Sequence, residues 1–216
     1  MSSFPSSVAT PRRLRHAALA VSVLTFVIGL LSVAEAFGLS TLDEHRSRVE
    51  AEARRFDFLG DPGLLSAANG AQIATLEGMK VARGVVLGAL AAACGMAFVS
   101  ALRLLRPDGL PREGVRRLLV SSLVATAVLR TVDGAQWAVV AQRSMRAAVA
   151  HLKTVEPRVG MAIPEPILEP LTLAGVLAHT ALVAGLLLLL AQYFRSERVK
   201  QLVALQDRGC QPPSPP

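Results

Sequence analysis

Residues Val115–Gln142 read VRRLLVSSLVATAVLRTVDGAQWAVVAQ, an apolar stretch that carries an arginine and an aspartate part-way along it. Twelve uncharged residues, Leu118–Leu129, separate the basic residues at its start from Arg130. The stretch contains no proline, so one continuous helix can run through it. At about 1.5 Å rise per residue, a helix of this length crosses a bilayer whose hydrocarbon core is about 30 Å thick. We interpret it as a membrane-spanning helix with polar residues in its interior.

The rest of the chain contains three further apolar blocks. Of its 216 residues, 52% are hydrophobic and 18% are charged. In soluble domains about a quarter of the residues are charged. The blocks Ala17–Ala34, Gly84–Leu102 and Leu171–Phe194 contain no Asp, Glu, Lys or Arg, and each is long enough to cross a bilayer. The sequence therefore predicts an all-α membrane protein, a bundle of four transmembrane helices at about 17–39, 81–105, 115–140 and 171–194.

The net charge of +7 is unevenly placed along the chain. Three segments together carry twelve basic and only four acidic residues: the one before the first block, the one between the second block and the opening stretch, and the one after the last block. The connections 40–83 and 141–170 together carry ten basic and ten acidic residues. This is the positive-inside pattern. It places both termini and the 103–117 connection in the cytoplasm, and only four crossings satisfy it. We expect a multi-pass protein of the cell (inner) membrane, the membrane type being inferred from the Ala-, Leu- and Arg-rich composition.

The ends and outer connections complete the predicted organisation. Residues 1–11 are rich in Ser and Pro and are expected to be disordered, followed by a transmembrane domain at 12–206 and a disordered cytoplasmic tail at 207–216. Ala34-Glu35-Ala36 also fits a signal-peptide cleavage site, but the uncharged run before it is longer than usual for a signal peptide, which favours retention of the first helix.

The outer loops 40–80 and 141–170 contain helical patterns of their own. Residues 41–58 fit an amphipathic helix with a capping box at its start, a second helix begins near Ala71, and the third span continues outward to about Leu152. These segments, 41–58, 71–80 and 141–153, predict a small extracytoplasmic helical cap. Four prolines, Pro157, Pro164, Pro166 and Pro170, predict an extended connection to the last span, whose helix continues to about Gln206.

Polar residues gather on one side of the helix in the opening stretch. Arg130, Asp133 and Gln136 fall within about one third of its circumference. A charge inside the membrane is costly and is usually turned toward the bundle or toward water, and Asp133 can pair with Arg130 three residues before it. Glu35 is expected at a similar depth, and His179 falls mid-way along the last span. The candidate polar cluster is therefore Arg130, Asp133, Gln136, Glu35 and His179, with either a structural ion pair or an ion path as its role.

A second candidate feature is the small-residue stripe Gly84, Gly88, Ala91 and Gly95 on the second span. Such a stripe lets another helix backbone approach closely. We expect packing inside the chain, with self-association as the alternative.

Recognisable catalytic and cofactor patterns do not occur in the sequence. It contains no HExxH, GxSxG or phosphate-binding glycine loop, and its four histidines and two cysteines are scattered. One Trp and one Tyr form no platform for nucleic acid bases. We therefore predict no enzymatic activity, no metal, no cofactor and no nucleic-acid partner. The expected partners are the lipid bilayer and another membrane protein or a second copy. The leading hypothesis is a non-catalytic accessory, assembly or sensory component, and the alternative is a small transporter or channel-like protein.

Overall fold

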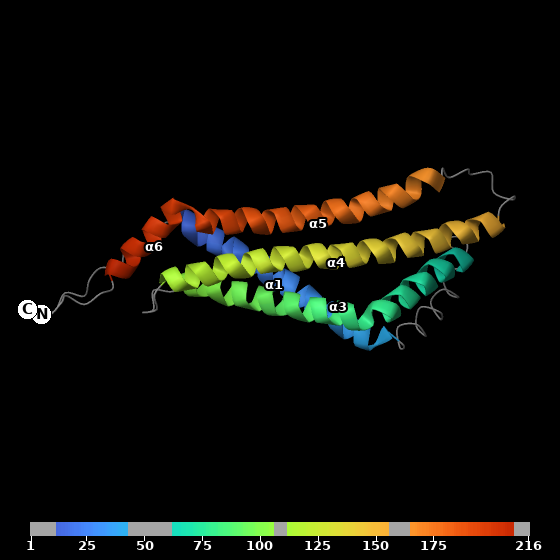
Figure 1. The fold of residues 1–216 in the computed structure, drawn as a ribbon, viewed down its shortest axis with the longest axis horizontal. Coiled ribbons are helices and arrows are strands. Elements are labelled where there is room, and N and C mark those ends of the chain that lie inside the picture. Colours follow the sequence, from blue (N-terminus) through green and yellow to red (C-terminus); the bar gives the residue numbers. More distant parts are fainter. Residues whose placement is uncertain (1–11, 43–61, 106–111, 156–164, 210–216) are drawn as a thin grey trace, which may run out of the picture. The chain divides into compact units, whose positions relative to one another are not determined.

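A computed structural model of the chain describes residues 12–42, 62–105, 112–155 and 165–209, and all its regular elements in these ranges are helices. In chain order they are α1 (Arg12–Ser40), α3 (Pro62–Leu105), α4 (Arg112–Val155), α5 (Glu165–Arg195) and α6 (Glu197–Gly209) (Figure 1). The predicted all-α class is confirmed for this part of the chain. The predicted helix at 41–58 and the disordered segment at 1–11 lie outside the described residues, apart from Thr41 and Leu42.

Four of these helices, α1, α3, α4 and α5, are long and apolar enough to cross a membrane. They contain the four predicted spans, as expected of a multi-pass membrane protein. Helices α3 and α4 each have 44 residues, which corresponds to about 66 Å of helix. Because this is about twice the hydrocarbon thickness, each of these two helices extends well beyond the length needed for one crossing.

Two helices begin earlier than predicted, and prolines explain both differences. Helix α3 begins at Pro62, nine residues before the predicted start at Ala71. A proline suits the first turn of a helix because the N–H it lacks would have no partner there. Helix α5 begins at Glu165 and includes Pro170, so the predicted extended connection is wrong over residues 165–170.

The helices fold into two compact units, each described here by itself. The first comprises the described parts of residues 1–32, 89–129 and 183–216. Its core is a cluster of buried aliphatic side chains and one phenylalanine from α1, α3, α4, α5 and α6, including Val21, Ala97, Leu123, Leu187 and Phe194. Small residues let the helices approach closely, and a Cβ atom on Gly29 would lie 3.1 Å from Cβ of Cys94.

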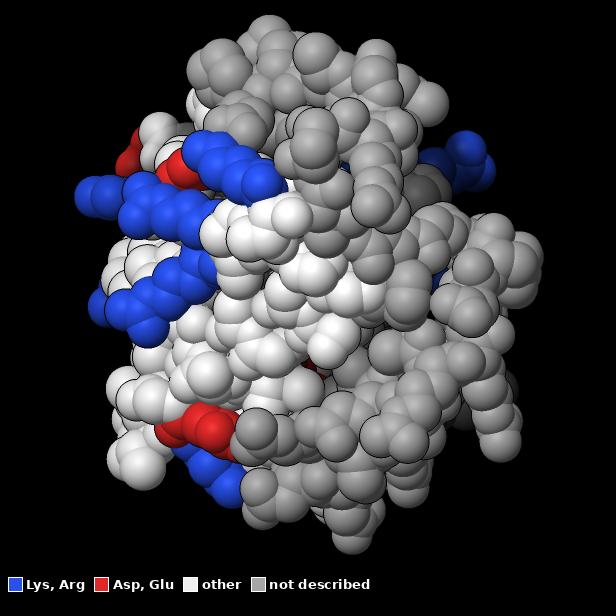
Figure 2. All heavy atoms as spheres, turned by 90° about the vertical axis from the view of Figure 1, so that its right-hand side faces the viewer, with Lys and Arg blue, Asp and Glu red and all other residues white. Residues whose placement is uncertain are grey.

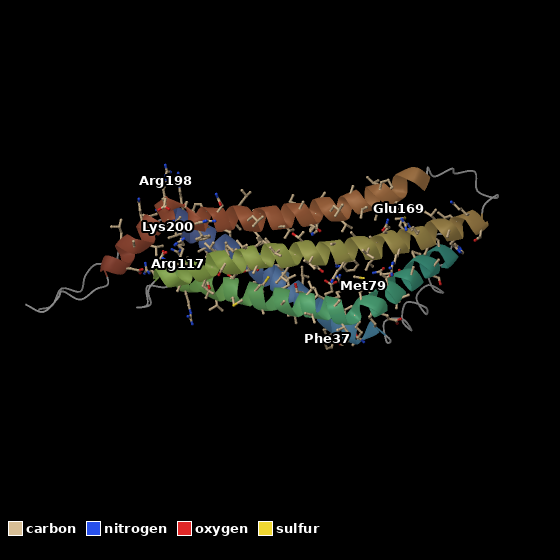
Figure 3. All side chains as sticks on the ribbon, in the orientation of Figure 1. Phe37, Met79, Arg117, Glu169, Arg198 and Lys200 are labelled. Atoms are coloured by element: carbon tan, nitrogen blue, oxygen red, sulfur yellow. The ribbon has the colours of Figure 1, made fainter. Side chains whose placement is uncertain are left out.

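Helix α6 docks on the start of α4 within this unit. The chain bends at Ser196, and α6 then buries Val199 and Val203 in the core while Arg198 is exposed on its other side (Figure 3). The Asp207 carboxylate accepts hydrogen bonds from the backbone N–H groups of Arg112 (3.1 Å) and Glu113 (3.3 Å). These N–H groups have no partner inside α4, because the first turn of a helix leaves its donors free. The predicted tail boundary at 207 is therefore too early, since residues 207–209 belong to α6.

Arg116 provides a second link between α4 and the end of α5. Its Nη1 donates to the backbone carbonyl of Phe194 (2.8 Å), and its Nε and Nη2 donate to the Glu113 carboxylate. The hydrogen bonds from Arg116, with those from Arg117 in addition, lower the pKa of Glu113 from 4.5 to about 2. Glu113 is therefore held as a carboxylate at the beginning of α4, where the helix dipole also favours negative charge.

The second unit comprises the described parts of residues 33–88 and 130–182. Leu39, Leu42, Leu76, Leu87 and Val140 form its apolar core. At the far end of α4, Gln142 and Arg146 both donate to Oε1 of Glu169 on α5, at 3.0 and 2.9 Å. Figure 2, which views this end of the helices, shows side chains of both charges on the same face. This unit contains the candidate polar residues.

Candidate functional site: a buried ion cluster

Arg83 of α3 is the centre of a cluster of charged side chains in the second unit. Its side chain is completely buried. The guanidinium Nε donates to Oε1 of Glu35 on α1 at 3.0 Å, and Nη2 donates to the same oxygen. The same Nη2 lies 3.0 Å from Oδ1 of Asp133 on α4. One arginine therefore joins carboxylates from two other helices.

Arg130 completes the cluster from within α4. Its Nη1 donates to Oδ2 of Asp133, which is fully buried, whereas the Arg130 side chain is 21% exposed. The predicted Arg130–Asp133 pair is confirmed. The cluster thus contains two arginines and two carboxylates, so its formal net charge is zero. This matters because a buried charge without a partner is far more costly than a paired one.

Trp137 covers one side of the cluster. The guanidinium carbon of Arg83 lies 4.6 Å from the centroid of the Trp137 ring, within the range of a cation–π interaction. Trp137 follows Asp133 by four residues, so both side chains lie on the same face of α4. The indole shields the Arg83 guanidinium from its surroundings, and its ring face attracts the positive charge.

Helices α4 and α5 approach each other closely next to Asp133. A Cβ atom added to Gly134 would lie 2.8 Å from Cβ of Thr180 on α5 and closer still to the Thr180 Oγ1 and Cγ2 atoms. Glycine is therefore required at this position by the neighbouring helix. Thr180 is itself buried and donates to the backbone carbonyl of Val176 at 2.8 Å.

Three buried polar atoms around the cluster form no hydrogen bond with the described residues. They are Nη1 of Arg83, Oδ1 of Asp133 and Oε1 of Gln136. The contact of Asp133 Oδ1 with Arg83 is close enough for an ion pair but is not aligned as a hydrogen bond. Buried polar groups in proteins are normally satisfied by protein or by ordered water, so the cluster retains the capacity to bind a further polar group.

A pocket of about 230 Å³ lies directly beside the cluster. Glu35 and Trp137 belong to its wall, and the Glu35 side chain is 28% exposed. The remaining lining comes from the end of α1, the two residues after it and the N-terminal part of α3. It combines glycine and aliphatic residues with uncharged polar residues: Gly38, Leu39, Thr41, Leu42, Asn69, Gln72, Ile73 and Leu76. The pocket gives one carboxylate of the cluster access to the surface.

The predicted cluster members do not all come together. Glu35, Arg130 and Asp133 share one network, although Glu35 pairs with Arg83 rather than with Arg130. Gln136 is half-buried on the same helix. His179 is exposed on α5, and its neighbour Thr180 is the residue that faces α4. The placement of His179 in the cluster is therefore wrong.

Arg83 and Trp137 are the two cluster residues that sequence reasoning missed as site residues. Arg83 immediately precedes the uncharged block Gly84–Leu102, so the charge pattern assigns it to the connection 40–83. A charge balance would have identified it: two candidate carboxylates, Glu35 and Asp133, faced only one candidate cation, Arg130. The continuous helix through residue 83 then leaves Arg83 as the charged residue directly before the block.

The predicted small-residue stripe has an unexpected environment. Cβ atoms added to Gly84, Gly88 and Gly95 would meet no heavy atom of the described residues within 4 Å, while Ala91 is half-buried. At these three glycines the structure therefore differs from the expected packing inside the chain. Self-association through the stripe stays a prediction.

The described residues contain no group of three or more His, Cys, Asp or Glu side chains placed to hold a metal ion. No protein-family model matches the chain, and no curated protein or solved structure is significantly similar to it.

Proposed function

We propose that the chain is a non-catalytic component of the cell (inner) membrane, serving as an accessory, assembly or sensory partner of another membrane protein. The observation that supports this is the internal compensation of the ion cluster. Arg83, Glu35, Asp133 and Arg130 pair with one another across three helices, so the charges fix the relative register of α1, α3 and α4. We infer a structural role for the cluster.

The proposed arrangement in the membrane follows from charge and length. The basic connection 103–117 and both termini lie in the cytoplasm, in accordance with the positive-inside rule. The parts of α3 and α4 that exceed one crossing extend on the opposite side, where they form the helical cap. The cluster then lies toward the outer half of the bilayer, and the pocket beside Glu35 opens near the outer surface.

Replacement of Arg83 tests the structural role. In Arg83→Met, two carboxylates lose their shared partner, and breaking a buried ion pair in this way costs about 3–5 kcal/mol. We expect lower thermal stability in detergent by circular dichroism and reduced co-purification of partner membrane proteins. The double variant Arg83→Met/Glu35→Met removes both members of one pair and is expected to recover most of the loss.

Arg117→Met is the matched control, because Arg117 forms an exposed pair with Glu113. Exposed pairs contribute about 0–1 kcal/mol. A wild-type melting temperature in Arg83→Met, or an Arg117→Met protein that is equally destabilised, would contradict the structural role.

A small transporter or channel-like protein is the alternative function. The pocket at Glu35 and the three unsatisfied buried atoms favour it, because ionisable groups within a span are typical of ion and proton paths. This alternative predicts a proton- or ion-coupled flux in liposomes that is lost in Asp133→Asn. A flat trace from wild-type protein whose helical content and melting temperature are intact would exclude it.

A further inference from the structure

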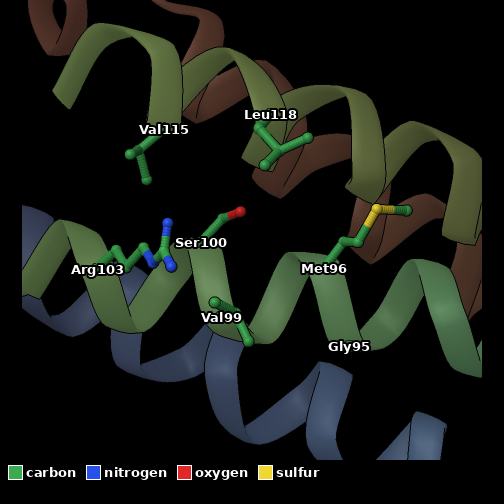
Figure 4. Close-up of a pocket in the computed structure, with 7 residues that line it drawn as sticks. All are labelled: Gly95, Met96, Val99, Ser100, Arg103, Val115 and Leu118. Carbon is green, nitrogen blue, oxygen red and sulfur yellow. The ribbon is translucent and has the colours of Figure 1, made fainter. Parts of the chain in front are cut away.

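A second cavity, of about 270 Å³, lies in the first unit between α3 and α4. Its lining on α3 is Gly95, Met96, Val99, Ser100 and Arg103, and its lining on α4 is Val115 and Leu118. Figure 4 shows the Arg103 guanidinium and the Ser100 hydroxyl on the side of α3 that faces α4. The groove is thus apolar along most of its length and carries a cation near one end.

The groove is accessible from the surface of the helices. Met96, Val99 and Leu118 are each 47–48% exposed although they line it. Gly95 in the lining leaves open space, since a Cβ there would meet no described heavy atom within 4 Å outside its own helical turn. On a helix that crosses a membrane, such a surface is in contact with acyl chains. An acyl chain is therefore the occupant whose chemistry matches the apolar lining.

Charge identifies the other end of the occupant. Arg103 is exposed and forms no hydrogen bond or ion pair with any described residue, unlike Arg116 and Arg117, which both bind Glu113. Arg103 is also the first charged residue after the uncharged block Gly84–Leu102, so it lies where the hydrocarbon ends and the headgroups begin. Arginine forms paired hydrogen bonds with phosphate.

We infer that this groove is a binding site for one anionic phospholipid. Its phosphate binds Arg103 and one of its acyl chains occupies the groove along Ser100, Val99, Met96 and Gly95. Basic pockets between transmembrane helices are a known mode of anionic lipid recognition. This site is separate from the ion cluster, and it does not depend on the proposed accessory function.

Native mass spectrometry of the full chain, extracted from nanodiscs of equal phosphatidylglycerol and phosphatidylcholine, tests this inference. We expect the wild-type protein to retain one phosphatidylglycerol in preference to phosphatidylcholine. Arg103→Gln is expected to lower the affinity for phosphatidylglycerol about fivefold, the factor that one arginine contributes at an anionic surface, and thereby the lipid-bound fraction. Arg103→Lys is expected to restore most of it. Gly95→Leu fills the groove and is expected to lower the bound fraction at least as much.

Two matched controls separate this site from general effects. Arg198→Gln removes an exposed arginine of α6, away from the groove, and Gly88→Leu adds the same side chain at another open glycine of α3. Both are expected to retain lipid as the wild type does. Equal retention of the two lipids, an equal loss in Arg103→Gln and Arg198→Gln, or full retention in Gly95→Leu would each overturn the inference.

Discussion

Arg83 illustrates how one residue determines the interior of a helical unit. Its guanidinium reaches Glu35 on α1 and Asp133 on α4 and packs on Trp137. Lysine could not replace it, because a single ammonium cannot present several donors in a plane while stacking on an indole. Sequence reasoning identified Arg130–Asp133 because three-residue spacing along one helix is readable. It missed Arg83 because pairing between helices depends on their rotation about their own axes, and only the unbalanced charge of Glu35, Asp133 and Arg130 indicated a second cation.

Glu113 gives a prediction about pH at the scale of one residue. Its pKa is about 2 in the folded protein instead of 4.5, primarily because Arg116 donates hydrogen bonds to it. A carboxyl whose pKa is lowered by folding contributes stability that is complete above about pH 4.5 and is lost as the pH falls toward 2. We expect the difference in melting temperature between wild type and Glu113→Gln to shrink across this window. Circular dichroism melts between pH 6 and pH 2.5 would measure it.

The control for this prediction is Glu197→Gln, since Glu197 is an exposed residue of α6 paired only with Lys200 among the described residues. Its difference from wild type is expected to be small at all pH values. A constant difference between wild type and Glu113→Gln over the whole range would show that the lowered pKa does not stabilise the fold.

Among the elements, α4 and α5 show what the sequence could and could not predict. The span in α5 followed from length and hydropathy, whereas the span in α4 also needed the charge pattern of the connections, because Arg130 interrupts its uncharged run after twelve residues. The absence of proline up to Pro157 correctly predicted the long α4. The face of α5 that packs on α4 was not predictable, because this helix is apolar all round. That is why His179 was placed in the cluster although Thr180 is the buried residue. The start of α5 at Glu165 was missed because prolines are compatible with a first helical turn.

The contact between α4 and α5 gives a prediction at Gly134. Alanine in the middle of a helix normally stabilises by up to about 1 kcal/mol relative to glycine. At Gly134 the added methyl group would overlap with Thr180, and such overpacking costs about 1–3 kcal/mol. We therefore expect Gly134→Ala to lower the melting temperature and Gly134→Ala/Thr180→Ala to recover part of the loss. Gly88→Ala, at an open position, is expected to be neutral or stabilising; equal effects at Gly134 and Gly88 would argue against the close approach.

For the whole molecule, the number of crossings and their orientation form one prediction. The chain contains two cysteines, and Cys94 is buried in the first unit, so a membrane-impermeant thiol reagent is expected to react mainly at Cys210. In right-side-out membrane vesicles we expect Cys210 to be protected until the membrane is permeabilised. Asp108→Cys in a Cys210→Ser background should behave in the same way, because both positions are proposed to be cytoplasmic.

Arg158→Cys in the same background provides the opposite reference, since the connection between α4 and α5 is proposed to lie outside. It is expected to react without permeabilisation. If Cys210 and the cysteine at 108 were labelled from opposite sides, the four-span arrangement would be wrong, because α4 and α5 together must return the chain to its starting side.

The single tryptophan of the chain has a practical consequence. Trp137 packs on the Arg83 guanidinium and also belongs to the wall of the pocket at Glu35. Its ultraviolet emission therefore comes from this one location and serves as an intrinsic optical probe. A titration with candidate small molecules that enter the pocket would change the wavelength or intensity of that emission, without any attached dye.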